Sequence, residues 1–192
     1  LLFFGAAGIF LFLAGFTGLM AVFITIVLTI YYTSIEYGPT SNVAKTSKDS
    51  PSLNIIAGLS AGFSSTFGPI IVFVIAIGGA YVFGTLFGQQ MLATLSSNPT
   101  NILGKNISPE IFLITFGIWG INMASVSSDV IISTILSFDT FGPILDNAAG
   151  ISQMGKEEDQ TPEDLRTNLD RLDAVGNTTK AVVKGFALVC GG

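Results

Sequence analysis

Histidine is absent from this chain of 192 residues, and cysteine occurs once, at Cys190. The missing histidine excludes histidine-based metal sites and catalytic triads, and a single cysteine excludes an internal disulfide framework. Charged residues are also scarce, at 11% of the chain against roughly 25% in an average soluble domain. Because the net charge is −5 and no basic patch is evident, we expect no nucleic-acid partner.

Long apolar runs take the place of the missing charge. Hydrophobic residues make up 49% of the chain, and the mean hydropathy is +0.68. A helix needs about 20 apolar residues to cross about 30 Å of hydrocarbon, and several uncharged runs are longer. The sequence therefore predicts an all-α, polytopic transmembrane helix bundle, with helices at about 1–35, 53–87, 110–147 and 168–192. Apolar runs reach both Leu1 and Gly192, so we expect a single transmembrane domain fragment of a longer protein.

The connectors between these helices predict an orientation. Connectors 36–52 and 148–167 must lie on one side of the membrane and connector 88–109 on the other. Seven of the eight basic residues lie in or beside the first two connectors, and only Lys105 lies in the third. The positive-inside rule then makes 36–52 and 148–167 cytoplasmic and 88–109 the outer connector.

The last predicted helix carries a polar row on one face. Asp170, Asp173, Asn177, Lys180 and Lys184 fall within an arc of about 80° at 100° per residue. A charge at the centre of a membrane helix costs roughly 3 kcal/mol or more, so the row should face a polar cavity or other charges. The alternative is an amphipathic helix at the membrane edge whose charges reach water.

The third predicted helix supplies carboxylates that suit this row. Asp139 and Asp146 are separated by about two turns and share a face. Carboxylates bind Mg²⁺ through oxygen and lysines bind phosphate oxygens, so one interpretation is a magnesium–phosphate substrate. The other interpretation is that these acids form structural ion pairs with Lys180 and Lys184, and the residues alone favour neither.

A third acid in this helix, Asp129, lies deeper in the apolar run. An ionisable residue inside a membrane span is a functional candidate by default. The alternative is a structural aspartate satisfied beside Ser127 and Ser128.

Four segments resemble motifs of the membrane-bound, proton-translocating pyrophosphatases. Residues 139–151, DTFGPILDNAAGI, resemble the family pattern DAYGPIxDNAGGI, and residues 172–187, LDAVGNTTKAVVKGFA, resemble LDAxGNTT[A/K]AxxKG[F/Y]A. Residues 31–34 resemble the end of TEYYTS, and residues 54–62 resemble NIIxGLAxG. The chain departs from these patterns at Ile30, where TEYYTS has glutamate, and at Ala149, where DNAGG has glycine. It also departs at Gln153, where the family pattern IAEM has glutamate.

The resemblance implies an integral, multi-pass membrane protein of about sixteen helices, usually a homodimer in the lipid bilayer. Members of the family hydrolyse Mg²⁺-pyrophosphate on the cytoplasmic side and move H⁺ or Na⁺ across the membrane. Lysine at the position of Lys180 is typical of K⁺-independent members, and it favours H⁺ as the pumped ion. Two alternatives use the same scaffold: a catalytically inactive homologue and a secondary ion transporter or channel.

The resemblance also implies roles for individual residues. Asp146 and Asn177 occupy positions of ligands for Mg²⁺ and substrate. Asp139, Asp173 and Lys184 occupy positions near that site. The catalytic candidates are then Asp139, Asp146 and Lys184. Asp173 and Lys184 join Asp146 and Asn177 as candidates for binding substrate or Mg²⁺. Lys180 is the implied determinant of K⁺ independence.

Overall fold

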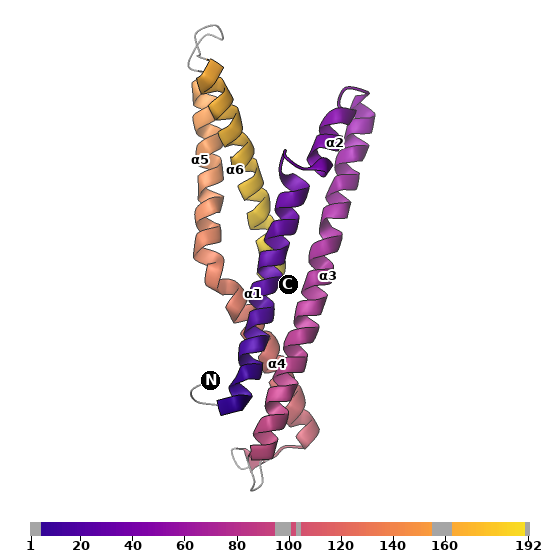
Figure 1. Ribbon diagram of the computed structural model, residues 1–192, viewed down its shortest axis with the longest axis vertical. Coiled ribbons are helices and arrows are strands. Elements are labelled where there is room, and N and C mark those ends of the chain that lie inside the picture. Colours follow the sequence, from indigo (N-terminus) through magenta and orange to yellow (C-terminus); the bar gives the residue numbers. More distant parts are fainter. Residues whose placement is uncertain (1–4, 95–100, 103–104, 155–162, 191–192) are drawn as a thin grey trace. The chain divides into compact units, whose positions relative to one another are not determined.

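The computed structural model describes residues 5–94, 101–102, 105–154 and 163–190, and confirms the predicted all-α fold. Figure 1 shows the helices. The elements in chain order are η1 (Gly5–Ala7), α1 (Gly8–Thr33), α2 (Gly38–Thr46), α3 (Pro51–Thr94), β1 (Asn101–Ile102), β2 (Lys105–Asn106), α4 (Pro109–Ser128), η2 (Asp129–Ile131), α5 (Ile132–Met154) and α6 (Glu163–Cys190). The two short strands pair antiparallel, with Asn101 opposite Asn106.

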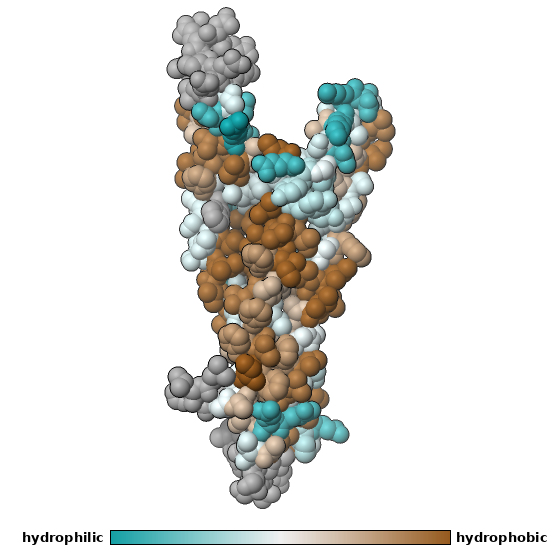
Figure 2. All heavy atoms as spheres, viewed as in Figure 1, coloured by the Kyte–Doolittle hydropathy of each residue, from teal (hydrophilic) through white to brown (hydrophobic). Residues whose placement is uncertain are grey.

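Three stretches of the described chain are long and apolar enough to cross a membrane: Gly5–Thr46, Pro51–Thr94 and Pro109–Ser152. With 44 residues, α3 is about 66 Å long at 1.5 Å per residue, which exceeds the roughly 30 Å of a hydrocarbon core. Figure 2 shows hydrophobic residues over much of the helices, and hydrophilic residues around α2 and the adjoining end of α3. The charged row keeps α6 out of this set, although the sequence predicted a transmembrane helix there.

Capping side chains explain where two helices begin. Ser50 Oγ accepts a hydrogen bond from the Leu53 amide at 3.2 Å, ahead of Pro51 at the start of α3. Ser108 Oγ accepts one from the Ile111 amide at 3.4 Å, ahead of Pro109 at the start of α4. Both arrangements combine a serine cap with proline in the first turn, where the missing amide costs nothing.

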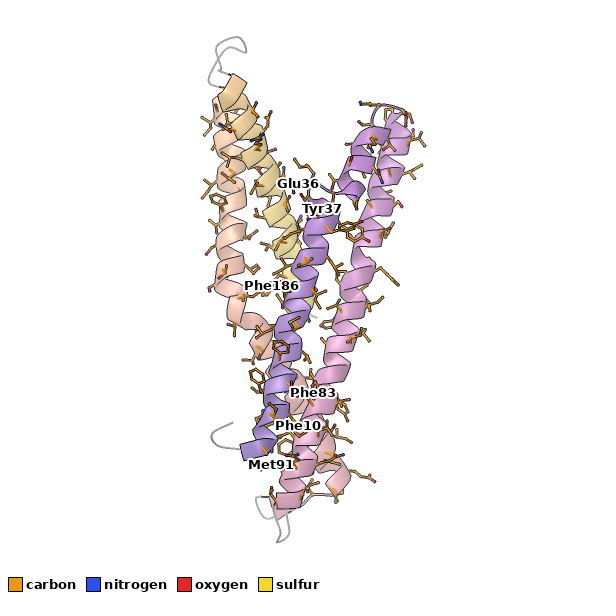
Figure 3. The ribbon with its side chains drawn as sticks, in the orientation of Figure 1. Phe10, Glu36, Tyr37, Phe83, Met91 and Phe186 are labelled. Carbon is orange, nitrogen blue, oxygen red and sulfur yellow. The ribbon has the colours of Figure 1, made fainter. Side chains whose placement is uncertain are left out.

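The connector predicted at 36–52 contains a helix, α2, that the sequence interpretation did not include. Pro39 lies in its first turn, where its fixed φ suits helical geometry. The Thr40 hydroxyl donates to the Tyr32 carbonyl at 3.1 Å and ties α2 to the end of α1. Glu36 and Tyr37 lie in the turn between the two helices (Figure 3). The Tyr37 and Tyr31 rings are 5.5 Å apart, so aromatic rings gather where an apolar helix ends, as at membrane interfaces.

The structure differs from the single helix predicted at 110–147. A 3₁₀ turn, η2, separates α4 from α5, and α5 continues to Met154. The Asp129 amide is shared between the carbonyls of Ser125 and Ser127, which tightens the backbone at this point. Hydropathy does not reveal such a break because 3₁₀ and α turns accept the same residue types.

The chain divides into two compact units, Leu1–Ile24 with Ile70–Val130, and Thr25–Pro69 with Ile131–Gly192. In the first unit, glycines bring backbones together: a methyl group on Gly18 would collide with the Ala124 carbonyl, and one on Gly84 with the Phe116 carbonyl. Such close approach allows the van der Waals packing that helps to hold helices together in lipid. The candidate site lies in the second unit.

Candidate functional site

Helices α5 and α6 of the second unit pack side by side (Figure 1). Two glycines make the contact close. A methyl group built on Gly142 of α5 would lie 3.1 Å from the Gly176 carbonyl oxygen of α6. A methyl group on Gly176 would lie 3.3 Å from the Gly142 carbonyl oxygen. Both glycines are buried, and each belongs to one of the two long motifs. The close crossing therefore brings the two motifs together.

One predicted pair of charges meets at this crossing. Lys180 Nζ of α6 donates to Asp146 Oδ2 of α5 in an ion pair between residues 34 positions apart. The Lys180 side chain is 28% exposed and that of Asp146 is 35% exposed, so the pair is partly shielded from solvent. Within the described part of the chain, the second carboxylate oxygen, Asp146 Oδ1, is buried and has no hydrogen-bond partner. Asp146 therefore retains a free acceptor in a shielded position.

The other predicted residues of α5 and α6 are less closely joined. Asn177 Nδ2 donates to Asp173 Oδ2 at 3.4 Å, one turn apart on α6. Asp173 is half-buried, and Asn177 and Asp139 are exposed. Asp139 forms no ion pair with any described residue. The structure thus unites Asp146 with Lys180 and Asp173 with Asn177, and leaves Asp139 outside both pairs.

Lys184 lies in a different setting from Lys180. It borders a pocket of about 260 Å³ whose walls come from α1, α3 and α6. The lining residues are Thr29, Tyr32, Thr33, Ser65, Thr66, Pro69, Ala181, Lys184 and Gly185. A methyl group on Gly185 would lie 2.5 Å from Thr29 Oγ1, so this glycine allows α6 to approach α1 closely beside Lys184.

The serine and threonine hydroxyl groups around this pocket donate within their own helices. Thr29 and Thr33 donate to carbonyls one turn back at 2.8 and 2.7 Å, and Ser65 and Thr66 do the same at 2.7 and 2.8 Å. Each oxygen consequently remains an acceptor, and acceptors suit an ammonium group such as that of Lys184. The sequence interpretation missed these hydroxyls, although their place in uncharged apolar helices was an available signal.

Of the remaining candidates from the sequence, the structure describes the side chains of Asp129, Ile30 and Ala149. Asp129 is exposed at the start of η2 in the first unit. Ile30 is half-buried on α1, and Ala149 is buried on α5 with 5% exposure. The side chain of Gln153 lies outside the described residues.

The acids that the structure describes form at most part of a metal site. In the residues that the structure describes, no group of three or more histidine, cysteine, aspartate or glutamate side chains is placed to hold a metal ion. The unpaired Asp146 Oδ1 is nevertheless the kind of oxygen that a hard divalent cation prefers. Asp146 is thus able to contribute one carboxylate ligand to a metal site that other residues complete.

Comparison with known proteins assigns the chain to a family. The family model for inorganic H⁺ pyrophosphatase matches residues 2–191. A "K(+)-insensitive pyrophosphate-energized proton pump 2" of Moorella thermoacetica is 36% identical over 184 residues, which cover 96% of this chain and 23% of the relative. A "Pyrophosphate-energized membrane proton pump 3" of Arabidopsis thaliana is 36% identical over 177 residues, 92% of this chain and 19% of the relative.

A third relative, a "K(+)-insensitive pyrophosphate-energized proton pump" of Caldanaerobacter subterraneus, is 38% identical over 172 residues, 90% of this chain and 20% of the relative. The chain spans about a fifth of the length of these curated relatives. Together with its three membrane-crossing stretches, the match identifies an integral, multi-pass membrane protein. The resemblance in the motifs is confirmed: the chain belongs to the inorganic H⁺ pyrophosphatase family.

Proposed function

We propose that the chain forms part of an ion-translocating inorganic pyrophosphatase that couples hydrolysis of Mg²⁺-pyrophosphate to H⁺ transport without requiring K⁺. The observation that carries this proposal is the ion pair between Lys180 and Asp146, which joins the two long motifs. Two of the relatives described above are named as K⁺-insensitive proton pumps, in agreement with the proposal. The activity belongs to the full-length protein, and this chain alone should not hydrolyse pyrophosphate.

The ion pair gives a physical account of K⁺ independence. The Lys180 ammonium places one positive charge against Asp146 Oδ2. A bound K⁺ would supply the same charge, but it would have to be drawn from solution and would be lost at low concentration. A tethered ammonium is present at every K⁺ concentration, so hydrolysis should not respond to added K⁺.

Asp146 is also the proposed magnesium ligand of this chain. Lys180 occupies Oδ2, while Oδ1 is buried and unpaired and therefore fits a divalent cation. The proposal adds Asn177 as a neighbouring oxygen ligand, held one turn from Asp173 by their hydrogen bond. When bound, Mg²⁺ would offset negative charge on the phosphate oxygens. Further carboxylates from the rest of the protein must complete the set.

The other candidates have proposed roles toward pyrophosphate. Asp139 carries an exposed carboxylate on α5, suited to orienting a water molecule that attacks phosphorus. Lys184 is exposed and long enough to present its ammonium to a phosphate oxygen when its stem turns away from the α1–α3 pocket. Asp173 holds Asn177 in place. Positioning and charge stabilisation would then supply most of the rate enhancement.

The proposed topology follows the basic residues. Connectors 36–52 and 148–167 are cytoplasmic, connector 88–109 faces outward, and residues 1–192 form one transmembrane domain. The proposed partners are pyrophosphate, H⁺, the lipid bilayer and a second copy of the full-length chain. No nucleic-acid partner is proposed.

The decisive experiment measures Mg²⁺-dependent pyrophosphate hydrolysis by membranes that contain the full-length protein, with and without K⁺. We expect activity that ignores K⁺ in the native protein and requires K⁺ after Lys180→Ala. If the native protein requires K⁺, the proposal that it is a pyrophosphatase stands and the proposed role of Lys180 is wrong. A folded, membrane-inserted protein without activity would favour the inactive homologue or the transporter.

A further inference from the structure

The stem of Lys180 crosses α5 at the one position of the DTFGP segment that has no side chain. A methyl group built on Gly142 would lie 3.0 Å from Lys180 Cγ and 3.1 Å from Lys180 Cε. These distances are shorter than the roughly 3.5–4.0 Å at which carbon atoms pack best. Gly142 is buried, so a methyl group there has no free space to enter. The absence of a side chain at Gly142 therefore makes room for the Lys180 stem to reach Asp146.

The two neighbours of Gly142, the Lys180 stem and the Gly176 carbonyl, differ in how easily they can move. The Lys180 stem has several rotatable bonds, whereas the Gly176 carbonyl, 3.1 Å from the same built methyl group, is fixed in the backbone of α6. A small clash is relieved at least cost by turning the stem. That turn moves the ammonium away from Asp146. The contact with the Gly176 carbonyl stays the same whatever residue stands at position 180, so comparing the two backgrounds separates it from the effect on the stem.

We propose that Gly142 is a positioning residue that sets the cation requirement of the enzyme by seating the Lys180 ammonium on Asp146. The proposal rests on the function proposed above and adds a specificity determinant on the opposite helix from Lys180. Residue 180 supplies the charge, and residue 142 decides whether that charge arrives at the carboxylate. A lysine at 180 combined with a larger residue at 142 should not confer full K⁺ independence.

A purely structural role for Gly142 predicts something different. If the glycine served only to let α5 and α6 approach, its substitution would act through the Gly176 carbonyl. The loss would then be the same whether or not residue 180 carries a long side chain, and added K⁺ would not repair it. The two roles are separable because one depends on the Lys180 stem and the other does not.

The test is a double-mutant cycle in the full-length protein, with Gly142→Ala, Lys180→Ala and the double variant. We expect Gly142→Ala to lower hydrolysis about tenfold without K⁺, the size expected when a supporting contact of a site residue is lost, and K⁺ to restore most of it. In the Lys180→Ala background the same substitution should change K⁺-supported hydrolysis less than about twofold. Gly78→Ala is the matched control, because a methyl group at Gly78 meets none of the described residues within 4 Å.

Thermal unfolding in detergent gives a readout that does not need activity. Gly142→Ala should lower the Tm more in the presence of Lys180 than in its absence, so the positioning role is tested even if the native protein proves inactive and the proposed function fails. If Gly142→Ala prevents folding, Lys180→Ala should restore folding in the double variant. Equal losses of activity and Tm in both backgrounds, or a double variant that also fails to fold, would overturn the proposal.

Discussion

Replacing Phe87 by alanine tests how the first unit is held together. Phe87 is 1% exposed and is among the largest fully buried side chains described. Its ring centroid lies 5.4 Å from that of Phe116 and 5.6 Å from that of Trp119, so α3 and α4 share an aromatic cluster. Removing the ring should open a cavity against α4.

The expected loss of unfolding free energy in Phe87→Ala depends on what surrounds the helices. Alanine is about 100 Å³ smaller than phenylalanine, and a cavity costs about 24 cal/mol per Å³, which gives roughly 2.4 kcal/mol if the site does not collapse. In a soluble core the transfer of the ring out of water would add to this and bring the cost to about 3–5 kcal/mol. Lipid chains are as apolar as the protein interior, so that addition should be absent here.

The assay is reversible denaturation of the full-length protein in detergent micelles, with Phe63→Ala as the control. Phe63 lies on the same helix and is 75% exposed in this chain, so its removal opens no cavity among the described residues and should cost less than the removal of Phe87. Equal losses in the two variants would refute the packing argument. A loss above about 4 kcal/mol at Phe87 alone would refute the claim that the surroundings are already apolar.

Two further predictions concern the second unit. Asp146→Ala in the full-length protein should reduce hydrolysis by about 100-fold or more, because it removes both the partner of Lys180 and the unpaired Oδ1. Wild-type turnover in a folded variant would show that Asp146 is not part of the site. Gly185→Ala should lower both Tm and hydrolysis, because the new methyl group would lie 2.5 Å from Thr29 Oγ1 and push α6 away from α1 beside Lys184. Adding Thr29→Ala should recover part of the Tm, and no recovery would locate the damage elsewhere.

The helices were predictable because their cause is local. Uncharged runs longer than about 20 residues leave few options other than a membrane helix, and serine followed by proline marks where α3 begins. The break at Asp129–Ile131 and the short helix α2 were not predicted. Both depend on where individual amides find acceptors, and hydropathy does not record that.

The sequence named the residues of the candidate site, but it did not say which of their side chains pair. Periodicity placed Lys180 and Lys184 about 40° apart on one helix face, and the motifs singled out Asp139 and Asp146. Two interpretations then remained, a magnesium–phosphate site and structural ion pairs. The structure shows one such pair, between Lys180 and Asp146, and leaves an oxygen of the same aspartate unpaired.

The sequence by itself determined that this protein is helical, that it lies in a membrane and that it belongs to its family, because long apolar runs and ordered motifs are properties of the chain. Only the tertiary structure decided which charges meet. Gly142 and Gly176 let α5 and α6 cross closely enough for Lys180 to reach Asp146, and Gly185 lets α6 approach α1 so that Lys184 borders a hydroxyl-lined pocket. The physical reason is that one turn separates the two lysines along α6, but the neighbouring helix that each one meets depends on how the helices cross.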